Sequence, residues 1–118
     1  MIRRTSELVQ EPKVNIRGGV GVGLGVDLLK VGEMAGVLSL GRITLEPGAT
    51  IGEHAHPDTE DLYLILAGRG IGVLNGDHFP VGPGDLFLVK AGGRHGLIND
   101  SAEPLTFMGL LTRSPARP

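Results

Sequence analysis

Glycine and proline interrupt the apolar segments of this chain at short intervals, and this pattern constrains the fold more than any other feature. The 118 residues include 20 glycines and 8 prolines, which separate apolar runs and form no repeat. Residues 20–26 alternate valine or leucine with glycine, and residues 36–45 alternate again, as expected for strands with two different faces. Asn75-Gly76 is a strong hairpin signal. Because no sustained helical period accompanies these runs, we predict an all-β sandwich or barrel.

A single domain is expected, because 118 residues can build one hydrophobic core and are too few for two. We predict an N-terminal arm over residues 1–13, one domain over residues 14–112 and a polar tail over residues 113–118. The domain would open with a strand over residues 14–29. A flexible linker and a phosphate-cradling loop are alternatives for this glycine-rich stretch. Its β-branched residues disfavour the linker, and no helix pattern follows it, as a phosphate loop would require.

Composition narrows the range of partners. The formal net charge is −2 and no long basic run occurs, so we expect no nucleic-acid partner. No segment approaches the roughly 18 apolar residues that a membrane span needs, and we expect a cytoplasmic protein. The absence of cysteine excludes disulfides, thiolate metal ligands and a thiol nucleophile. The expected partner is a small molecule, oxygen-rich or anionic.

A group of histidine and acidic residues predicts a metal site. His54 and His56 are two positions apart, so a strand would project both imidazoles from one face. Glu60 and Asp61 follow at the head of an apolar run, where a carboxylate needs a partner such as a cation. His95 is the best candidate for a third imidazole. Three histidines and one carboxylate suit Mn, Fe, Co, Ni, Cu or Zn better than Ca or Mg.

These residues also carry a resemblance to the cupin superfamily of small β-barrels. The first cupin motif is Gly, five residues, His-any-His, three or four residues, Glu, six residues, Gly. The second is Gly, five residues, Pro-any-Gly, two residues, His, three residues, Asn. The chain matches the first motif at Gly48, His54, His56 and Gly68, and the second at Gly84, Gly92, His95 and Asn99, with Lys90 in place of the proline.

The acidic position of the first motif is open between two residues. Counting three residues forward from His56 selects Glu60, and counting six residues back from Gly68 selects Asp61. We favour Asp61, because a strand holds its register more firmly than a loop does. The resemblance implies a double-stranded β-helix, or jelly-roll barrel, with a divalent transition metal inside, and commonly a homodimer that pairs or exchanges N-terminal strands.

Two classes of function are compatible with such a site. The first is a metal-dependent enzyme, an isomerase, lyase or dioxygenase, acting on a small carbohydrate or carboxylic acid. Glu60 and Tyr63 would then be its catalytic acid or base, with Glu53 as a further candidate. The second is a non-catalytic module that binds metal or a sugar-like ligand. Arg42 lies on a predicted strand, where it either faces outward or enters the barrel to bind an anion.

Overall fold

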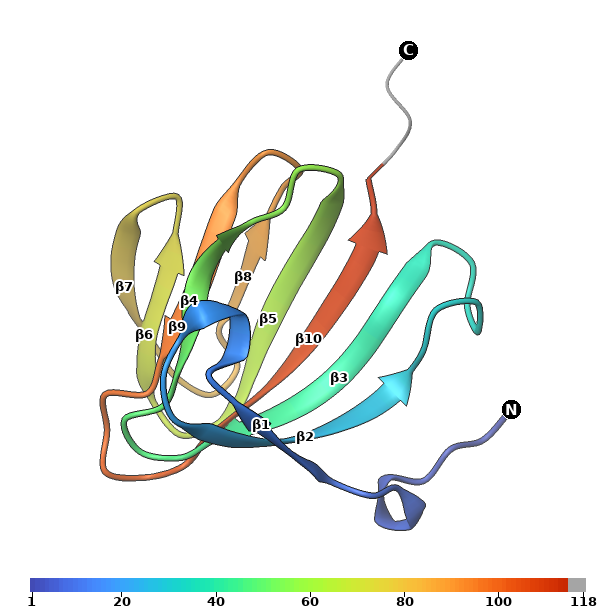
Figure 1. Cartoon of the computed structure of the whole chain (residues 1–118), viewed down its shortest axis with the longest axis horizontal. Helices are drawn as coiled ribbons and strands as arrows, with labels where there is room; N and C mark the ends of the chain where they lie inside the picture. Colours follow the sequence, from blue (N-terminus) through green and yellow to red (C-terminus); the bar gives the residue numbers. More distant parts are fainter. Residues whose placement is uncertain (115–118) are drawn as a thin grey trace.

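The computed structural model describes residues 1–114 as two antiparallel β-sheets with two short 3-10 turns (Figure 1). The six-stranded sheet has the order β1-β2-β3-β10-β5-β8, and the four-stranded sheet has the order β4-β9-β6-β7. The all-β prediction is therefore confirmed. No helix among the described residues is both long and apolar enough to cross a membrane. The elements are η1 (Thr5–Glu7), β1 (Glu11–Val14), η2 (Ile16–Gly18), β2 (Val22–Leu29), β3 (Val37–Leu45), β4 (Thr50–Ala55), β5 (Thr59–Ala67), β6 (Gly70–Leu74), β7 (Asp77–Val81), β8 (Leu86–Val89), β9 (Arg94–Ile98) and β10 (Leu105–Arg113).

The hydrophobic core lies between the two sheets and is formed by inward-facing side chains of both. In the six-stranded sheet, Phe107 of β10 lies opposite Ile43 of β3 and Ile65 of β5, so these three side chains share the inner face. Leu97 of β9 comes from the four-stranded sheet, and like Phe107 and Ile65 it is almost fully buried. Burying an aliphatic or aromatic side chain stabilises the fold by roughly 1.5–3 kcal/mol. On β2 the alternation places glycine inside, because Gly23 and Gly25 are buried while Leu24 is 42% exposed.

The N-terminal part of the chain differs from the prediction of one strand over residues 14–29. The chain turns at η2 instead, and β1 pairs with β2 as an antiparallel edge strand. Asn15 and Arg17 both have left-handed backbone conformations, with φ of 52° and 53°, and the amide of Asn15 donates to the carbonyl of Gly21. These conformations reverse the chain within a short span, which a periodicity of alternating side chains does not reveal. The predicted arm over residues 1–13 contains η1 and most of β1.

A β-bulge interrupts β4 just before the histidines. Ile51 lies opposite Leu97 of β9, and His54 lies opposite His95, so three steps along β4 match two steps along β9. The extra residue changes which alternate positions of β4 face inward. Ile51 and His56 are both buried, although they are separated by an odd number of positions, whereas Glu53 is exposed. The bulge thus allows one strand to contribute first to the core and then to a polar cluster.

Asn99 joins the end of β9 to two other segments. Its side chain is fully buried, and its Nδ2 lies 3.1, 3.2 and 2.8 Å from the carbonyl oxygens of Leu45, Glu46 and Glu103. Its Oδ1 accepts hydrogen bonds from the amide and hydroxyl of Ser101. One amide group therefore satisfies backbone groups of the β3–β4 and β9–β10 connections, which would otherwise be buried without partners.

Replacing Asn99 by Ala should destabilise the protein strongly. The substitution leaves buried carbonyl oxygens without donors, which we expect to cost about 2–4 kcal/mol of unfolding free energy. Urea denaturation followed by circular dichroism measures this loss. The neighbouring exposed residue Asp100 provides the control, because Asp100→Ala should change the unfolding free energy by less than about 0.5 kcal/mol. An Asn99→Ala protein as stable as the control would contradict this role.

Candidate metal centre

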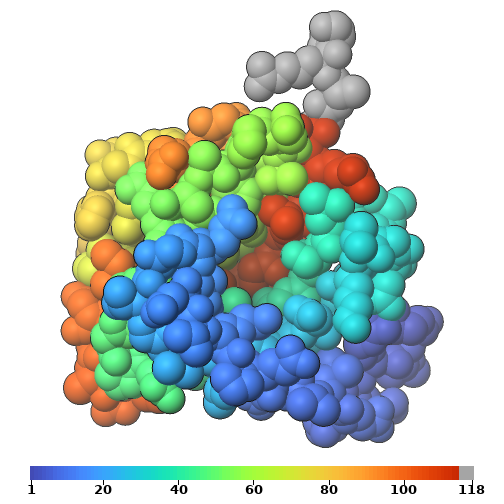
Figure 2. All heavy atoms as spheres, viewed as in Figure 1, coloured from blue at the N-terminus to red at the C-terminus, as the bar shows by residue number. Residues whose placement is uncertain are grey.

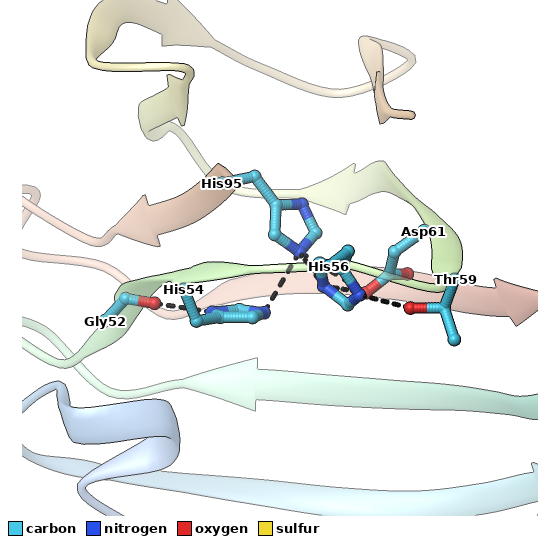
Figure 3. A network of polar contacts seen from close by, with 6 residues as sticks. All are labelled: Gly52, His54, His56, Thr59, Asp61 and His95. Atoms are coloured by element: carbon cyan, nitrogen blue, oxygen red, sulfur yellow. Dashed lines mark hydrogen bonds and ion pairs between the residues drawn. The ribbon is translucent and has the colours of Figure 1, made fainter. Parts of the chain in front are cut away.

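Three imidazoles and one carboxylate converge between the sheets (Figure 3). His54 comes from β4, His56 directly follows β4, Asp61 comes from β5 and His95 from β9. The Nε2 atom of His95 lies 3.1 Å from Nε2 of His54 and 3.0 Å from Nε2 of His56. Oδ2 of Asp61 lies 3.3 Å from Nε2 of His95 and 3.6 Å from Nε2 of His56. All four donor atoms are within 4.8 Å of one another.

A hydrogen bond on the far side of the His54 ring determines which of its nitrogens carries the proton. Nδ1 of His54 lies 2.7 Å from the carbonyl oxygen of Gly52, which can only accept, so Nδ1 carries the hydrogen. In a neutral ring, a protonated Nδ1 leaves the lone pair on Nε2. The lone pair of His54 therefore points into the cluster. Nδ1 of His56 lies 2.7 Å from Oγ1 of Thr59, and the same tautomer forms in His56 when this hydroxyl accepts.

Burial keeps these imidazoles neutral. It is the main cause that lowers the pKa of His54 to about 4, and it also lowers the pKa of His56. The proximity of His95 adds to both shifts, because like charges would repel. At neutral pH, His54 therefore offers a lone pair and needs to lose no proton before it binds a cation.

The donor set fits a first-row divalent ion. A single proton on Nε2 of His95 cannot satisfy the lone pairs of His54 and His56 together, whereas one cation can accept all of these donors. Two ligand atoms at bond lengths of about 2.1 Å and at right angles are about 3.0 Å apart, as these nitrogens are. Nδ1 of His95 is buried and forms no hydrogen bond within residues 1–114. Its ring is instead held by stacking on Tyr63, with the ring centres 4.3 Å apart.

The structure separates the two acidic candidates. Asp61 faces inward and belongs to the cluster. Glu60 is the preceding residue on the same strand and projects to the opposite face, where its carboxylate lies 3.8 Å from Nζ of Lys90. Glu53 is likewise outside the cluster and lies 3.6 Å from the guanidinium of Arg94. Neither glutamate is brought to the cluster of candidate metal ligands.

Tyr63 packs in the core and also borders the cluster. It is only 5% exposed, and its ring contacts His95, Phe87 and Phe107. Burial, with a smaller contribution from the charge of Asp61, raises the pKa of its hydroxyl well above the usual value. The hydroxyl is therefore protonated at neutral pH and holds its proton tightly, so it can donate a hydrogen bond but cannot act as a base.

The cluster lies in the wall of a cavity of about 480 Å³ that opens to solvent. His54, His56, Asp61 and Tyr63 line it, together with Phe107 and Gly109 of β10. Figure 2 shows the opening as a hollow between the blue N-terminal segment and the cyan and green strands, with red β10 at its floor. Its volume is within the range of small-molecule sites.

Two cationic residues at this cavity, Lys13 and Arg17, are absent from the sequence-based candidates. A strand assigned over residues 14–29 gave no reason to place Arg17 near the histidines, and only the turn at η2 brings it there. Arg42, for which an inward position was one of two alternatives, faces the outer side. Its neighbours Gly41 and Ile43 line the cavity, and Arg42 lies opposite Met108 on the other face of the sheet.

Comparisons with known proteins agree with this architecture. A cupin domain family model matches residues 41–111. A protein from Thermotoga maritima named "Oxalate-binding protein" is 35% identical over 82 residues, which span 69% of this chain and 68% of the relative. A crystal structure from Thermotoga maritima, described as a "predicted oxalate decarboxylase", superposes with a TM-score of 0.93 at 30% identity, covering 97% of this chain and 100% of that one.

A more distant structural neighbour shares the fold alone. The structure of a sugar phosphate isomerase from Silicibacter pomeroyi has a TM-score of 0.79 at 22% identity, and the match covers 98% of this chain and 77% of that one. The predicted double-stranded β-helix is therefore confirmed by sheet topology and by these neighbours together. The chain belongs to the cupin family.

Proposed function

We propose that this protein is a metal-dependent cupin that binds a small dicarboxylate of the oxalate class. The observation that carries the proposal is the convergence of three imidazole nitrogens and one carboxylate in the wall of an open cavity. His54, His56, Asp61 and His95 would hold a divalent transition ion. When bound, such an ion provides a positive centre that attracts and polarises the oxygen atoms of a carboxylate.

The charge of the proposed site favours anions. Three neutral imidazoles and one carboxylate around a divalent ion leave a net charge of about +1. The surroundings are partly apolar, because Ile43, Ile51 and Phe107 also line the cavity. A low local dielectric strengthens the attraction between this charge and a small anion. The relative named for oxalate binding supports the choice of ligand class.

Binding is favoured over proton-transfer chemistry by the positions of the acidic residues. A proton-transfer enzyme needs a base beside the reacting atoms, and both Glu53 and Glu60 pair with cations away from the cluster. The side chains of His54, His56 and Asp61 would be occupied as ligands. A cytoplasmic location, and the absence of nucleic-acid and membrane partners, stay predictions from the sequence.

Titration of metal-free protein with Mn²⁺ or Zn²⁺ should show one ion bound per chain, and the loaded protein should then bind oxalate. Loss of a direct ligand in His95→Ala should weaken metal affinity by more than about 100-fold, since even outer-shell changes cost 10–100-fold. Isothermal titration calorimetry measures both steps. His78→Ala is the matched control, because His78 is exposed and lies outside the cluster. Unchanged metal binding by His95→Ala would contradict the proposed site.

An enzymatic role is the second candidate, and the position of Tyr63 is the observation that favours it. Its protonated hydroxyl belongs to a residue that lines the cavity and stacks on His95. We expect any turnover of oxalate or of a related keto or sugar acid by the metal-loaded protein to fall at least about 10-fold in Tyr63→Phe, as for loss of a hydrogen bond to a charged group. Product analysis by liquid chromatography measures turnover. Equal turnover in both proteins would exclude Tyr63 as this hydrogen-bond donor.

A homodimer is proposed from the outer face of the six-stranded sheet, which is apolar across four strands. Leu110 of β10 lies opposite Leu40 of β3 and Leu62 of β5, and Leu62 lies opposite Leu88 of β8. Leu88 is 40% exposed and its neighbour on this face, Leu86, is 55% exposed. An extended apolar face of this kind is typical of an interface, and a second copy would bury the same leucines symmetrically.

Light scattering coupled to size-exclusion chromatography should give the mass of two chains for the wild type. Leu88→Glu should give the mass of one chain, because two like charges would be buried at the symmetric interface. Val31→Glu is the control, since Val31 is 64% exposed in the β2–β3 loop and away from this face. A dimeric Leu88→Glu protein, or a monomeric wild type, would contradict the interface.

A further inference from the structure

Two cationic residues line the same cavity as the cluster of candidate metal ligands. Lys13 of β1 and Arg17 of η2 line the cavity together with His54, His56 and Tyr63. Neither cation forms an ion pair or a side-chain hydrogen bond with any of residues 1–114. Burial is the main cause of the lowered pKa of His54, and the positive charge of Arg17 acts in the same direction. Arg17 is thus near the cluster and has no partner in this part of the chain.

Backbone packing holds Arg17 against β4, the strand that carries His54. A Cβ atom on Gly52 would collide with the carbonyl oxygen of Arg17, and a Cβ atom on Gly19 would collide with the carbonyl oxygen of Thr50. The amide of Val20 also donates to Oγ1 of Thr50 at 2.9 Å. Two glycines therefore allow η2 to lie directly on β4, only two residues before His54.

The conformation of Arg17 is unusual for its residue type. Its φ of 53° and ψ of 39° lie in the left-handed region, which glycine and asparagine adopt more easily than arginine. An arginine at such a position has a higher conformational energy than either alternative, and residues of this kind cluster at ligand sites. Here the turn places Arg17, an exposed residue, in the lining of the cavity.

Lys13 is positioned by a glycine as well. It lies opposite Gly23 on the inner face of β2, and a Cβ atom on the next inward residue, Gly25, would collide with the Lys13 side chain. The aliphatic part of Lys13 therefore lies across the strand at Gly25. Besides Asp61, one further acidic residue, Asp27, lines the cavity, and it is exposed.

We propose that Arg17, with Lys13 beside it, binds a second negatively charged group of the ligand, so that the site selects dianions over monoanions of the same shape. This inference rests on the proposed function, in which the first carboxylate of the ligand binds the metal ion. A guanidinium is suited to the task, because its planar donors match the two oxygens of a carboxylate. The chemical class is a dicarboxylate, and a ligand with one negative charge would leave Arg17 unpaired.

The test compares oxalate with oxamate, in which an amide replaces one carboxylate, on Mn²⁺-loaded protein by isothermal titration calorimetry. Arg17→Asn removes the guanidinium and keeps a residue that tolerates a φ of 53°. We expect its oxalate affinity to fall at least about 10-fold, as for loss of a charged hydrogen bond, and its oxamate affinity to fall less than about 3-fold. Arg94→Gln is the control. It removes a charge next to His95 that pairs with Glu53, and it should change oxalate affinity less than about 2-fold.

The outcomes separate this inference from the proposed function. If Arg17→Asn binds oxalate within 2-fold of wild type, or loses oxalate and oxamate affinity equally, Arg17 does not recognise the second charge, while metal-dependent binding stands. If the metal-loaded wild type binds neither anion, both proposals fail. Metal stoichiometry and circular dichroism check that the variant is folded. If Arg17→Asn does not bind metal, Arg17→Gly is measured instead, because glycine also accepts this backbone conformation. The same changes in oxalate and oxamate affinity are expected.

Discussion

The β-bulge in β4 is the constraint on which the cluster of three histidines and Asp61 depends. Between Ile51 and His54 the strand gains one residue relative to β9, so that Ile51 faces Leu97 in the core while His54 faces His95 in the cluster. A regular ladder would instead place Glu53 opposite His95 and turn His54 and His56 toward solvent. A single added residue therefore determines whether the barrel contains a polar centre. Gly52, within the bulge, also provides the carbonyl that orients His54 and the space that η2 occupies.

The cluster gathers three imidazoles and one carboxylate inside a folded domain, and this donor set favours occupation by a cation. His95 is fully buried with its Nε2 close to two other imidazole nitrogens, and Nδ1 of this ring has no hydrogen bond within residues 1–114. Burial, with a smaller contribution from charge repulsion, lowers the pKa of His54 and His56, so protonation of these two rings is disfavoured. A ligand that binds only the folded state stabilises that state. Metal binding at these residues would therefore be coupled to stability of the barrel.

The parts of the fold that depend on side-chain alternation and turn residues were predictable from the sequence. Alternating apolar residues indicated the strands, and the spacing of His54, His56 and His95 indicated the site that the structure forms from two paired strands. Alternation on β5 also separates Asp61 from Glu60, since adjacent residues project to opposite faces. The turn at η2 was not predictable, because it depends on left-handed conformations of Asn15 and Arg17 and on tertiary packing against Gly52. Without that turn, nothing in the sequence places Arg17 at the cavity.

X-ray absorption spectroscopy of the metal-loaded protein tests the central claim most directly, because it counts the imidazoles around the ion without relying on affinity. Three histidines bound through Nε2, with Asp61 completing the set, predict a first shell of nitrogen and oxygen atoms at about 2.0–2.2 Å. They also predict outer-shell scattering that requires three imidazole rings. A spectrum that is fitted equally well with one imidazole, or with none, would contradict the account. The bulge in β4 would then not serve to assemble a metal centre.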